Sequence, residues 1–243
     1  MPRSARYRAN VQSAEPLSPT VRRVILALDG PFTHEAGQAV FVEVRGAAGS
    51  VRRAPYSIAS APGEHGPGTL EIAVAEDRSS ERASSTATAL RDLAVGAEVL
   101  VEGPVGAFTR SGERRESAAL FVGAGTGVSP LRAMIADAVN APPVPLLLLF
   151  GAREESELLW RDDLDTLAHR MPHFQWMASL SRPREPAAAA RRGHVQAHLD
   201  EALAALGRQA LAFVCGPPAM VTSVSAALLA RGWNEERIVR DLH

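Results

Sequence analysis

Phe121–Pro130, with the sequence FVGAGTGVSP, decides the fold of the second half of the chain. An apolar run leads into Gly123, Gly125 and Gly127, and Pro130 then stands where the first turn of a helix tolerates proline. Glycines let the backbone approach a pyrophosphate closely, and the N–H groups at a helix N-terminus attract anions. The stretch therefore predicts a strand, a phosphate-binding turn and a helix.

The turn differs from the standard dinucleotide fingerprint in two ways. Its spacing is not G-x-G-x-x-G, because Val128 stands where the third glycine would fall. No acid follows the next predicted strand, since Phe150 precedes Gly151, Ala152 and Arg153, so the usual ribose-binding carboxylate is absent. On these residues alone, a plain glycine-rich turn is the alternative interpretation.

Strand and helix patterns alternate around this turn. Apolar residues recur with helical spacing from Leu131 to Val139, and continuous apolar runs typical of buried parallel strands occupy Leu146–Phe150 and Leu211–Cys215. The other predicted elements are strands at Ala118–Val122 and Phe174–Leu180, helices at Glu157–Ala168, Val195–Leu206 and Ala219–Arg231, and a loop over Arg182–Arg192. This order predicts a doubly wound parallel α/β sheet over residues 113–243.

Residues 1–112 have a different pattern. Short runs that alternate apolar and polar residues are separated by Gly and Pro; they are Val21–Leu28, Ala39–Val44, Thr69–Ala75 and Ala97–Glu102. Short strands with turns between them predict a small antiparallel β-barrel. We expect a loop and a short helix in Arg78–Leu90, and the join between the domains in Arg110–Glu116.

The charged residues and the single cysteine exclude several classes of protein. The 243 residues include 26 basic residues, all Arg, and 27 acidic residues, for a net charge of −1. Without Lys, neither a Lys-containing phosphate loop nor a Schiff-base enzyme can form. With Cys215 alone, a Cys₄ zinc or iron–sulfur site and an internal disulfide are excluded, and no metal site is expected.

The same counts bear on partners and location. A net charge near zero argues against a general nucleic-acid binder. No apolar run approaches the about 18 residues of a membrane span, and Met1–Asn10 is not followed by the apolar stretch of a signal peptide. We therefore expect a cytoplasmic protein that does not bind nucleic acid and has no membrane span.

Two further segments carry candidate ligand-binding residues. Arg53–Ser60, RAPYSIAS, places Tyr56 beside hydroxyl groups, so it could stack on a ring and bond its edge; an ordinary core tyrosine is the alternative. Phe213–Met220, FVCGPPAM, places Cys215 at the C-terminal end of a predicted parallel strand, where doubly wound sheets bind ligands. A small buried hydrophobe is the alternative for this cysteine.

A group of arginines follows another predicted strand. Ser181, Arg182 and Arg184 come directly after Phe174–Leu180 and could form a phosphate-binding cluster with Arg153, Arg191 and Arg192. A solvated charged loop is the alternative.

Together and in this order, these segments resemble the ferredoxin–NADP reductase superfamily. RAPYSIAS is similar to its flavin motif, VGAEVLVEGPVGAF (Val95–Phe108) to its last barrel strands, and VGAGTGVSP to its nicotinamide-pyrophosphate loop, with LLFGAR, SLSRP and FVCGPPAMV in family order. The resemblance covers nearly the whole chain. It implies a six-stranded antiparallel flavin-binding barrel over residues 1–112, followed by an NAD(P)-binding α/β domain over residues 113–243.

The resemblance also implies roles for individual residues. As the expected catalytic residues, Tyr56 would stack on the isoalloxazine, Ser57 would bond near its N5, and Cys215 would lie beside the nicotinamide C4. Arg53 would contact the flavin phosphates. All the residues expected to bind a cofactor are Arg53, Tyr56, Ser57, Ile58, Ala59, Ser84, Ser85, Thr86, Gly125, Thr126, Gly127, Pro130, Arg153, Ser181, Arg182, Cys215, Gly216, Pro217 and Met220.

The cofactors expected from the resemblance are FAD and NADP(H), with NAD(H) as the alternative nucleotide. Ser181 and Arg182 match positions that bind the 2′-phosphate in NADP-using members, which favours NADPH. Two features depart from the family pattern. Ala54 stands where the family has Arg, with Arg53 one position earlier, and Ser84, Ser85 and Thr86 replace the Gly-Gly-x-x-Ser segment, so FAD rather than FMN is an inference.

The implied function is that of an FAD-dependent NAD(P)H oxidoreductase. A hydride passes from the nicotinamide to the flavin, and electrons then pass to a separate acceptor, because one cysteine cannot hold an iron–sulfur cluster. The expected acceptor is an iron–sulfur protein such as ferredoxin, an oxygenase component, or a small molecule such as a quinone or free flavin. The alternatives are a flavin reductase and a nucleotide-binding electron-transfer subunit of a larger complex.

Overall fold

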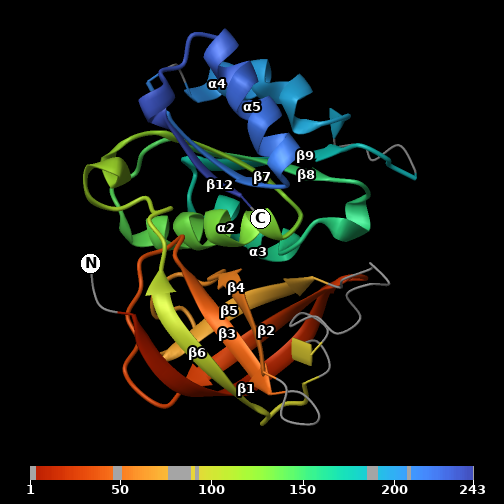
Figure 1. Cartoon of the computed structure of the whole chain (residues 1–243). Helices are drawn as coiled ribbons and strands as arrows, with labels where there is room; N and C mark the ends of the chain where they lie inside the picture. The colour runs from red at the N-terminus through yellow and green to blue at the C-terminus, as the bar shows by residue number, and fades with distance from the viewer. Residues whose placement is uncertain are drawn as a thin grey trace. The chain divides into compact units, whose positions relative to one another are not determined.

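The chain divides into two compact units, Met1–Thr109 and Arg110–His243, each with its own sheet and core. The computed structural model describes residues 4–45, 51–75, 89–90, 93–184, 191–206 and 209–242 (Figure 1). Within these ranges, no helix has both the length and the apolar character needed to cross a membrane.

The first unit is built on an antiparallel sheet with the strand order β4-β3-β6-β1-β2-β5. Its strands in the described residues are β1 (Ala5–Ser18), β2 (Val21–Leu28), β3 (Ala39–Arg45), β4 (Val51–Ser57), β5 (Thr69–Ala75) and β6 (Glu98–Val105). The two end strands meet where an isolated bridge joins Ile58 to Ile72. The sheet thus curls into a barrel, and the predicted six-stranded antiparallel fold is confirmed.

Alternating side chains of these strands fill the barrel. Val40, Val42 and Val44 of β3 are at most 2% exposed, whereas Phe41 and Glu43 between them lie on the outer face. This period of two is the pattern that the sequence displays in Ala39–Val44. It fixes which side chains of the neighbouring β4 share a face.

The second unit is a parallel sheet with the order β10-β9-β8-β7-β11-β12. Its strands in the described part of the chain are β7 (Ala119–Ala124), β8 (Leu146–Ala152), β9 (Phe174–Leu180), β10 (Arg191–Arg192), β11 (Leu211–Gly216) and β12 (Ile238–Leu242). Parallel strands buried on both faces read as continuous apolar runs, as in LLLLF of β8.

Helices cover both faces of this sheet, with α2 and α3 on one face and α4 and α5 on the other (Figure 1). They are α2 (Val128–Asp137), α3 (Arg161–Arg170), α4 (Leu199–Leu206) and α5 (Pro218–Ala230). Single 3₁₀ turns are η3 (Gly112–Glu116), η4 (Gly125–Gly127), η5 (Ala138–Asn140), η6 (Glu155–Glu157), η7 (Val195–His198) and η8 (Glu235–Arg237). The predicted doubly wound α/β fold is confirmed.

Two predicted element boundaries are wrong. The helix predicted to begin at Glu157 begins at Arg161, because Trp160 before it has a left-handed backbone conformation with φ 52°. The stretch predicted as a loop ends in the short strand β10, which pairs with β9.

Candidate functional site

The glycine-rich turn connects β7 to α2 in the predicted way. Gly125 has φ 56°, a left-handed conformation that favours glycine, and nothing lies within 4 Å of the position of an added Cβ. Thr126 is partly exposed, and Pro130 is buried in the first turn of α2. Gly125 is exposed and precedes the N-terminus of α2, so a pyrophosphate could approach the backbone here without a side chain in its way.

A close backbone contact joins this turn to the end of β11. A Cβ on Gly127 would lie 2.5 Å from Gly216 Cα and 2.6 Å from the Cys215 carbonyl oxygen. Gly216 has φ 149°, and a Cβ on it would lie 2.7 Å from Met220 Cε. The structure therefore brings four predicted site residues together at the carboxyl edge of the sheet, and Pro217 is exposed just beyond them.

The thiol of Cys215 is buried in this edge. Burial, and secondly the negative charge of Asp241, raise its pKa well above the ordinary value. Asp241 stands opposite Cys215 in the β11–β12 register. The thiol is thus protonated at neutral pH, which excludes a thiolate nucleophile and leaves a neutral, polarisable group.

The predicted arginine cluster lies at the carboxyl ends of β8, β9 and β10. The Ser181 N–H donates to the Ala152 oxygen at 3.0 Å, and the Arg182 N–H donates to the Arg153 oxygen at 2.8 Å. Arg192 stands opposite Leu180 in the short β10 pairing. The structure therefore brings Ser181, Arg182 and Arg192 to the same edge of the sheet.

Carboxylates neutralise some of these arginines. Arg153 pairs with Glu157, with a 3.0 Å bond from Nε, Arg184 pairs with Glu154 at 2.7 Å, and Arg191 pairs with Glu201. Burial alone would raise the pKa of Glu157, but the hydrogen bonds and charge of Arg153 outweigh it and lower that pKa.

Arg182 and Arg192 differ from the paired arginines at this edge. Among the described residues, the exposed side chains of Arg182 and Arg192 form no ion pair. A guanidinium without a carboxylate partner can form charge-assisted hydrogen bonds to a phosphate. This edge is therefore suited to a phosphate group on a ligand.

The flavin-motif segment lies in β4 and the residues just after it. Tyr56 is partly exposed, packs against the barrel core opposite Val40, and has its pKa raised by burial to about 12. Ser57 is 6% exposed. The N–H groups of Ile58 and Ala59 donate to the oxygens of Gln38 and Glu71 at 2.9 and 2.8 Å, so neither amide is available to a ligand.

Strand β4 ends the strand order, and the isolated bridge between Ile58 and Ile72 links this end of the sheet to β5 in the described residues. Tyr56, near the end of β4, is a half-buried aromatic residue, and such a ring can stack on a flat heterocycle.

Each of the two units matches a known domain family. Residues 8–109 match the model of the oxidoreductase FAD-binding domain, and residues 121–226 match that of the oxidoreductase NAD-binding domain. The ferredoxin–NADP reductase B of Sorangium cellulosum is 37% identical over 234 residues, which are 93% of this chain and 91% of that protein.

The chain belongs to the ferredoxin–NADP reductase superfamily. It is an FAD- and NAD(P)-binding oxidoreductase of this type. A cytochrome P450 reductase from Amycolatopsis has a similar structure, with a TM-score of 0.84, 28% identity, and coverage of 98% of this chain and 70% of that one. The phenol hydroxylase P5 protein of Acinetobacter pittii is 30% identical, and this reductase spans 64% of its length.

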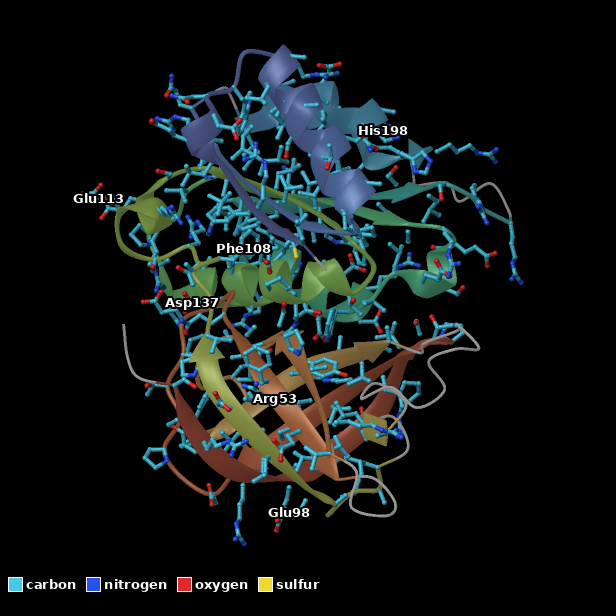
Figure 2. All side chains as sticks on the ribbon, viewed as in Figure 1. Arg53, Glu98, Phe108, Glu113, Asp137 and His198 are labelled. Carbon is cyan, nitrogen blue, oxygen red and sulfur yellow. The ribbon has the colours of Figure 1, made fainter. Side chains whose placement is uncertain are left out.

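Arg53 of this reductase does not share a face with Tyr56. Register places Arg53 opposite Glu43 on the outer face, and its Nη2 lies 3.1 Å from Glu102 Oε2. Its guanidinium carbon lies 4.0 Å from the centre of the Phe41 ring, and Figure 2 shows Arg53 on the barrel strands. Binding of the flavin phosphates by Arg53 therefore stays a prediction. The contacts of Arg53 with Glu102 and Phe41 on the outer face do not favour it.

Arg52 shares the face of Tyr56 instead, because it stands opposite the buried Val44. The sequence analysis missed Arg52 and also Asp241. The alternation of β4 could have indicated the first, whereas only the short terminal run IVRDL could have indicated the second. Ser84, Ser85 and Thr86 lie outside the described residues.

Proposed function

We propose that this reductase takes electrons from NADPH through FAD and passes them to an iron–sulfur protein or an oxygenase component in the cytoplasm. The observation that carries the proposal is the unobstructed backbone at Gly125 before α2, together with the close contact of Gly127 with Cys215 and Gly216 at the carboxyl edge of the sheet. The type of acceptor is supported by relatives named as a ferredoxin–NADP reductase, a phenol 2-monooxygenase reductase component and a toluate 1,2-dioxygenase electron transfer component.

The preference for NADPH is supported by the charges at the edge of β9. Arg182 and Arg192 form no ion pair among the described residues, and the hydroxyl of Ser181 lies 3.5 Å from the Ala152 oxygen at the end of β8. NADPH differs from NADH by a 2′-phosphate, for which such cations are suited. NADH is therefore expected to bind without this contribution.

Each group of residues has a distinct part in the proposed reaction. Bound flavin supplies the ability to take two electrons from a nicotinamide and release them singly. Tyr56 orients the flat ring by stacking, Ser57 offers a hydroxyl to its edge, Gly125 lets the dinucleotide backbone approach, and Gly127 lets the turn pack against Gly216. Cys215 keeps its proton and is buried at the end of β11.

An absorption spectrum of the purified protein, followed by anaerobic titration with NADPH and NADH, tests the proposal. We expect flavin bands that bleach at lower concentrations of NADPH than of NADH. A flavin spectrum that neither nucleotide changes would refute the reductase function. Turnover with ferredoxin compared with free FMN then separates an electron-transfer reductase from a flavin reductase, and turnover with FMN alone would refute the proposed acceptor.

A further inference from the structure

A buried cluster of ionisable side chains lies next to the flavin-motif segment. The Glu71 side chain is fully buried, and its Oε2 lies 3.1 Å from Arg23 Nη2 and 2.7 Å from His65 Nε2. The side chains of Arg23 and His65 are also largely buried, at 23% and 17% exposed. We call these three residues the Glu71 cluster. Nothing in the flavin or nucleotide sites described above uses it.

The backbone of Glu71 contacts the segment that follows Tyr56 and Ser57. Its carbonyl oxygen accepts the Ala59 N–H at 2.8 Å, and its N–H donates to Ser60 Oγ at 3.0 Å. Ala59 and Ser60 are at most 1% exposed. Glu71 therefore fixes the path of the chain directly after the flavin-motif residues.

These contacts lie at the seam where the barrel closes. β4 and β5 are the two ends of the strand order, and only the isolated bridge between Ile58 and Ile72 joins them as strands in the described residues. By contrast, β2 and β5 pair continuously from Val21–Ala75 to Ala27–Thr69. The seam thus depends on few ladder bonds, and the bonds of Glu71 supplement them.

The charge on Glu71 makes these contacts specific to one register. A fully buried carboxylate is tolerated only when its partners are in place, and a slip of β5 by one residue would turn it into the apolar barrel core. Arg23 comes from β2 and His65 from the loop between β4 and β5. The cluster therefore ties that loop and two strands to one geometry.

We propose that the Glu71 cluster is a latch that closes the barrel at the flavin-binding segment, and that Glu71 is a positioning residue for the flavin. The inference rests on the proposed function. With the latch intact, Ala59 and Ser60 stay on β5 and hold Ser57 in place. Without it, the segment separates from β5 and flavin is released faster.

Flavin release from the holoprotein tests the latch. We expect Glu71→Gln to release FAD about tenfold faster than the wild type, because breaking a buried ion pair leaves its partners uncompensated. Val99→Ala is the matched control, since Val99 lies in the barrel core on β6, away from the seam. At a similar loss in melting temperature, we expect the control to release FAD at nearly the wild-type rate.

A milder variant covers the case in which Glu71→Gln does not fold. His65→Gln removes one member of the cluster, and amide hydrogen exchange at Ile58 and Ala59 then reports the seam directly. We expect these two amides to exchange faster than in the wild type, while amides of β1 stay unchanged. Flavin retention near the wild-type level in His65→Arg, which places a permanent cation toward Glu71, would further support a positioning role.

Any of three results would overturn the latch. The first is a wild-type rate of flavin release in Glu71→Gln, and the second is a release rate that follows the loss of melting temperature equally in Glu71→Gln and Val99→Ala. The third is an unchanged rate of amide exchange at Ile58 and Ala59 in His65→Gln. The exchange measurement needs no bound flavin. A wild-type protein that binds neither FAD nor FMN would refute the proposed function, and the exchange result would still decide whether the latch exists.

Discussion

The glycine-rich turn of the second unit and strand β4 of the first unit form their candidate sites in different ways. At Gly127 the backbone itself approaches Gly216 so closely that no side chain fits. In β4 the candidate groups are side chains, and a shift of one position moves a group from the face of Tyr56 to that of Arg53. The site built from backbone thus tolerates no added side chain at Gly127. The site built from side chains depends instead on the register of β4.

The largest expected effect comes from the backbone contact. In Gly127→Ala the new Cβ would lie 2.5 Å from Gly216 Cα, so backbone must move, which costs about 1–3 kcal/mol or more. We expect kcat/KM for NADPH to fall about 100-fold. Gly232→Ala is the control, because Gly232 has φ 82° but open space around it, and its kcat/KM should stay near that of the wild type. Equal losses would show that the close contact is not what matters.

Arg182→Ala tests whether the second unit also uses side chains for specificity. Losing a hydrogen bond to a charged group costs about 1.5–3 kcal/mol, so KM for NADPH should rise about 10-fold to 100-fold while KM for NADH stays unchanged. Arg184→Ala serves as the control, since Arg184 already pairs with Glu154. A rise of the same size for both nucleotides would remove the proposed 2′-phosphate contact.

Tyr56→Ala tests the main side chain of the flavin site. Stacking beyond buried area contributes about 0.5–1.5 kcal/mol, so FAD should bind about 2-fold to 10-fold more weakly in a fluorescence titration. Tyr56→Phe keeps the ring and should bind FAD nearly as the wild type does. Normal affinity in Tyr56→Ala would contradict the stacking role.

The faces of β4 can be compared directly with two neighbouring substitutions. Arg52→Ala should weaken FAD binding a few-fold, because Arg52 shares the face of Tyr56. Arg53→Ala should change it by less than about 2-fold, because Arg53 already contacts Glu102 and Phe41 on the other face. The reverse order in a binding titration would place the ligand on the outer face.

The smallest expected effect is an acid-side loss of stability in the second unit. Because Arg153 lowers the pKa of Glu157, the pair stabilises the fold above the unfolded-state pKa, and this contribution is lost as pH falls through the lower folded-state value. The pair is partly exposed, so about 0.5 kcal/mol is expected. Urea unfolding of Glu157→Gln should show a weaker dependence on pH below pH 5 than the wild type; an unchanged slope would exclude the pair as its source.

The fold could be predicted best where glycine positions and the spacing of apolar residues decide the structure. The runs around Gly125 and in Leu146–Phe150 indicated the parallel sheet, because buried strands and glycine turns need these residue types. β1 was missed, since Ala9 and Val11 are the only residues of its 14 that are fully buried. β12 was missed because five residues at the end of the chain carry too little pattern.

The site was predicted less completely than the fold. Gly127, Cys215, Gly216 and Met220 lie together as a motif read along the chain suggests. The surroundings of Arg53 could not be read in this way, because they depend on Glu102 and Phe41, which come from other strands. The Glu71 cluster was missed for the same reason: its members lie on β2, β5 and a loop, and meet only when the barrel closes.

The protonated thiol of Cys215 has a consequence for the durability of the protein. Reduced flavins that meet oxygen generate hydrogen peroxide, and peroxide oxidises thiolates far faster than thiols. Cys215 is buried and its pKa is raised, so it presents almost no thiolate to such an oxidant at neutral pH. The sulfur atom at the carboxyl edge of the parallel sheet is therefore less open to oxidation by peroxide than the thiol of an exposed cysteine would be.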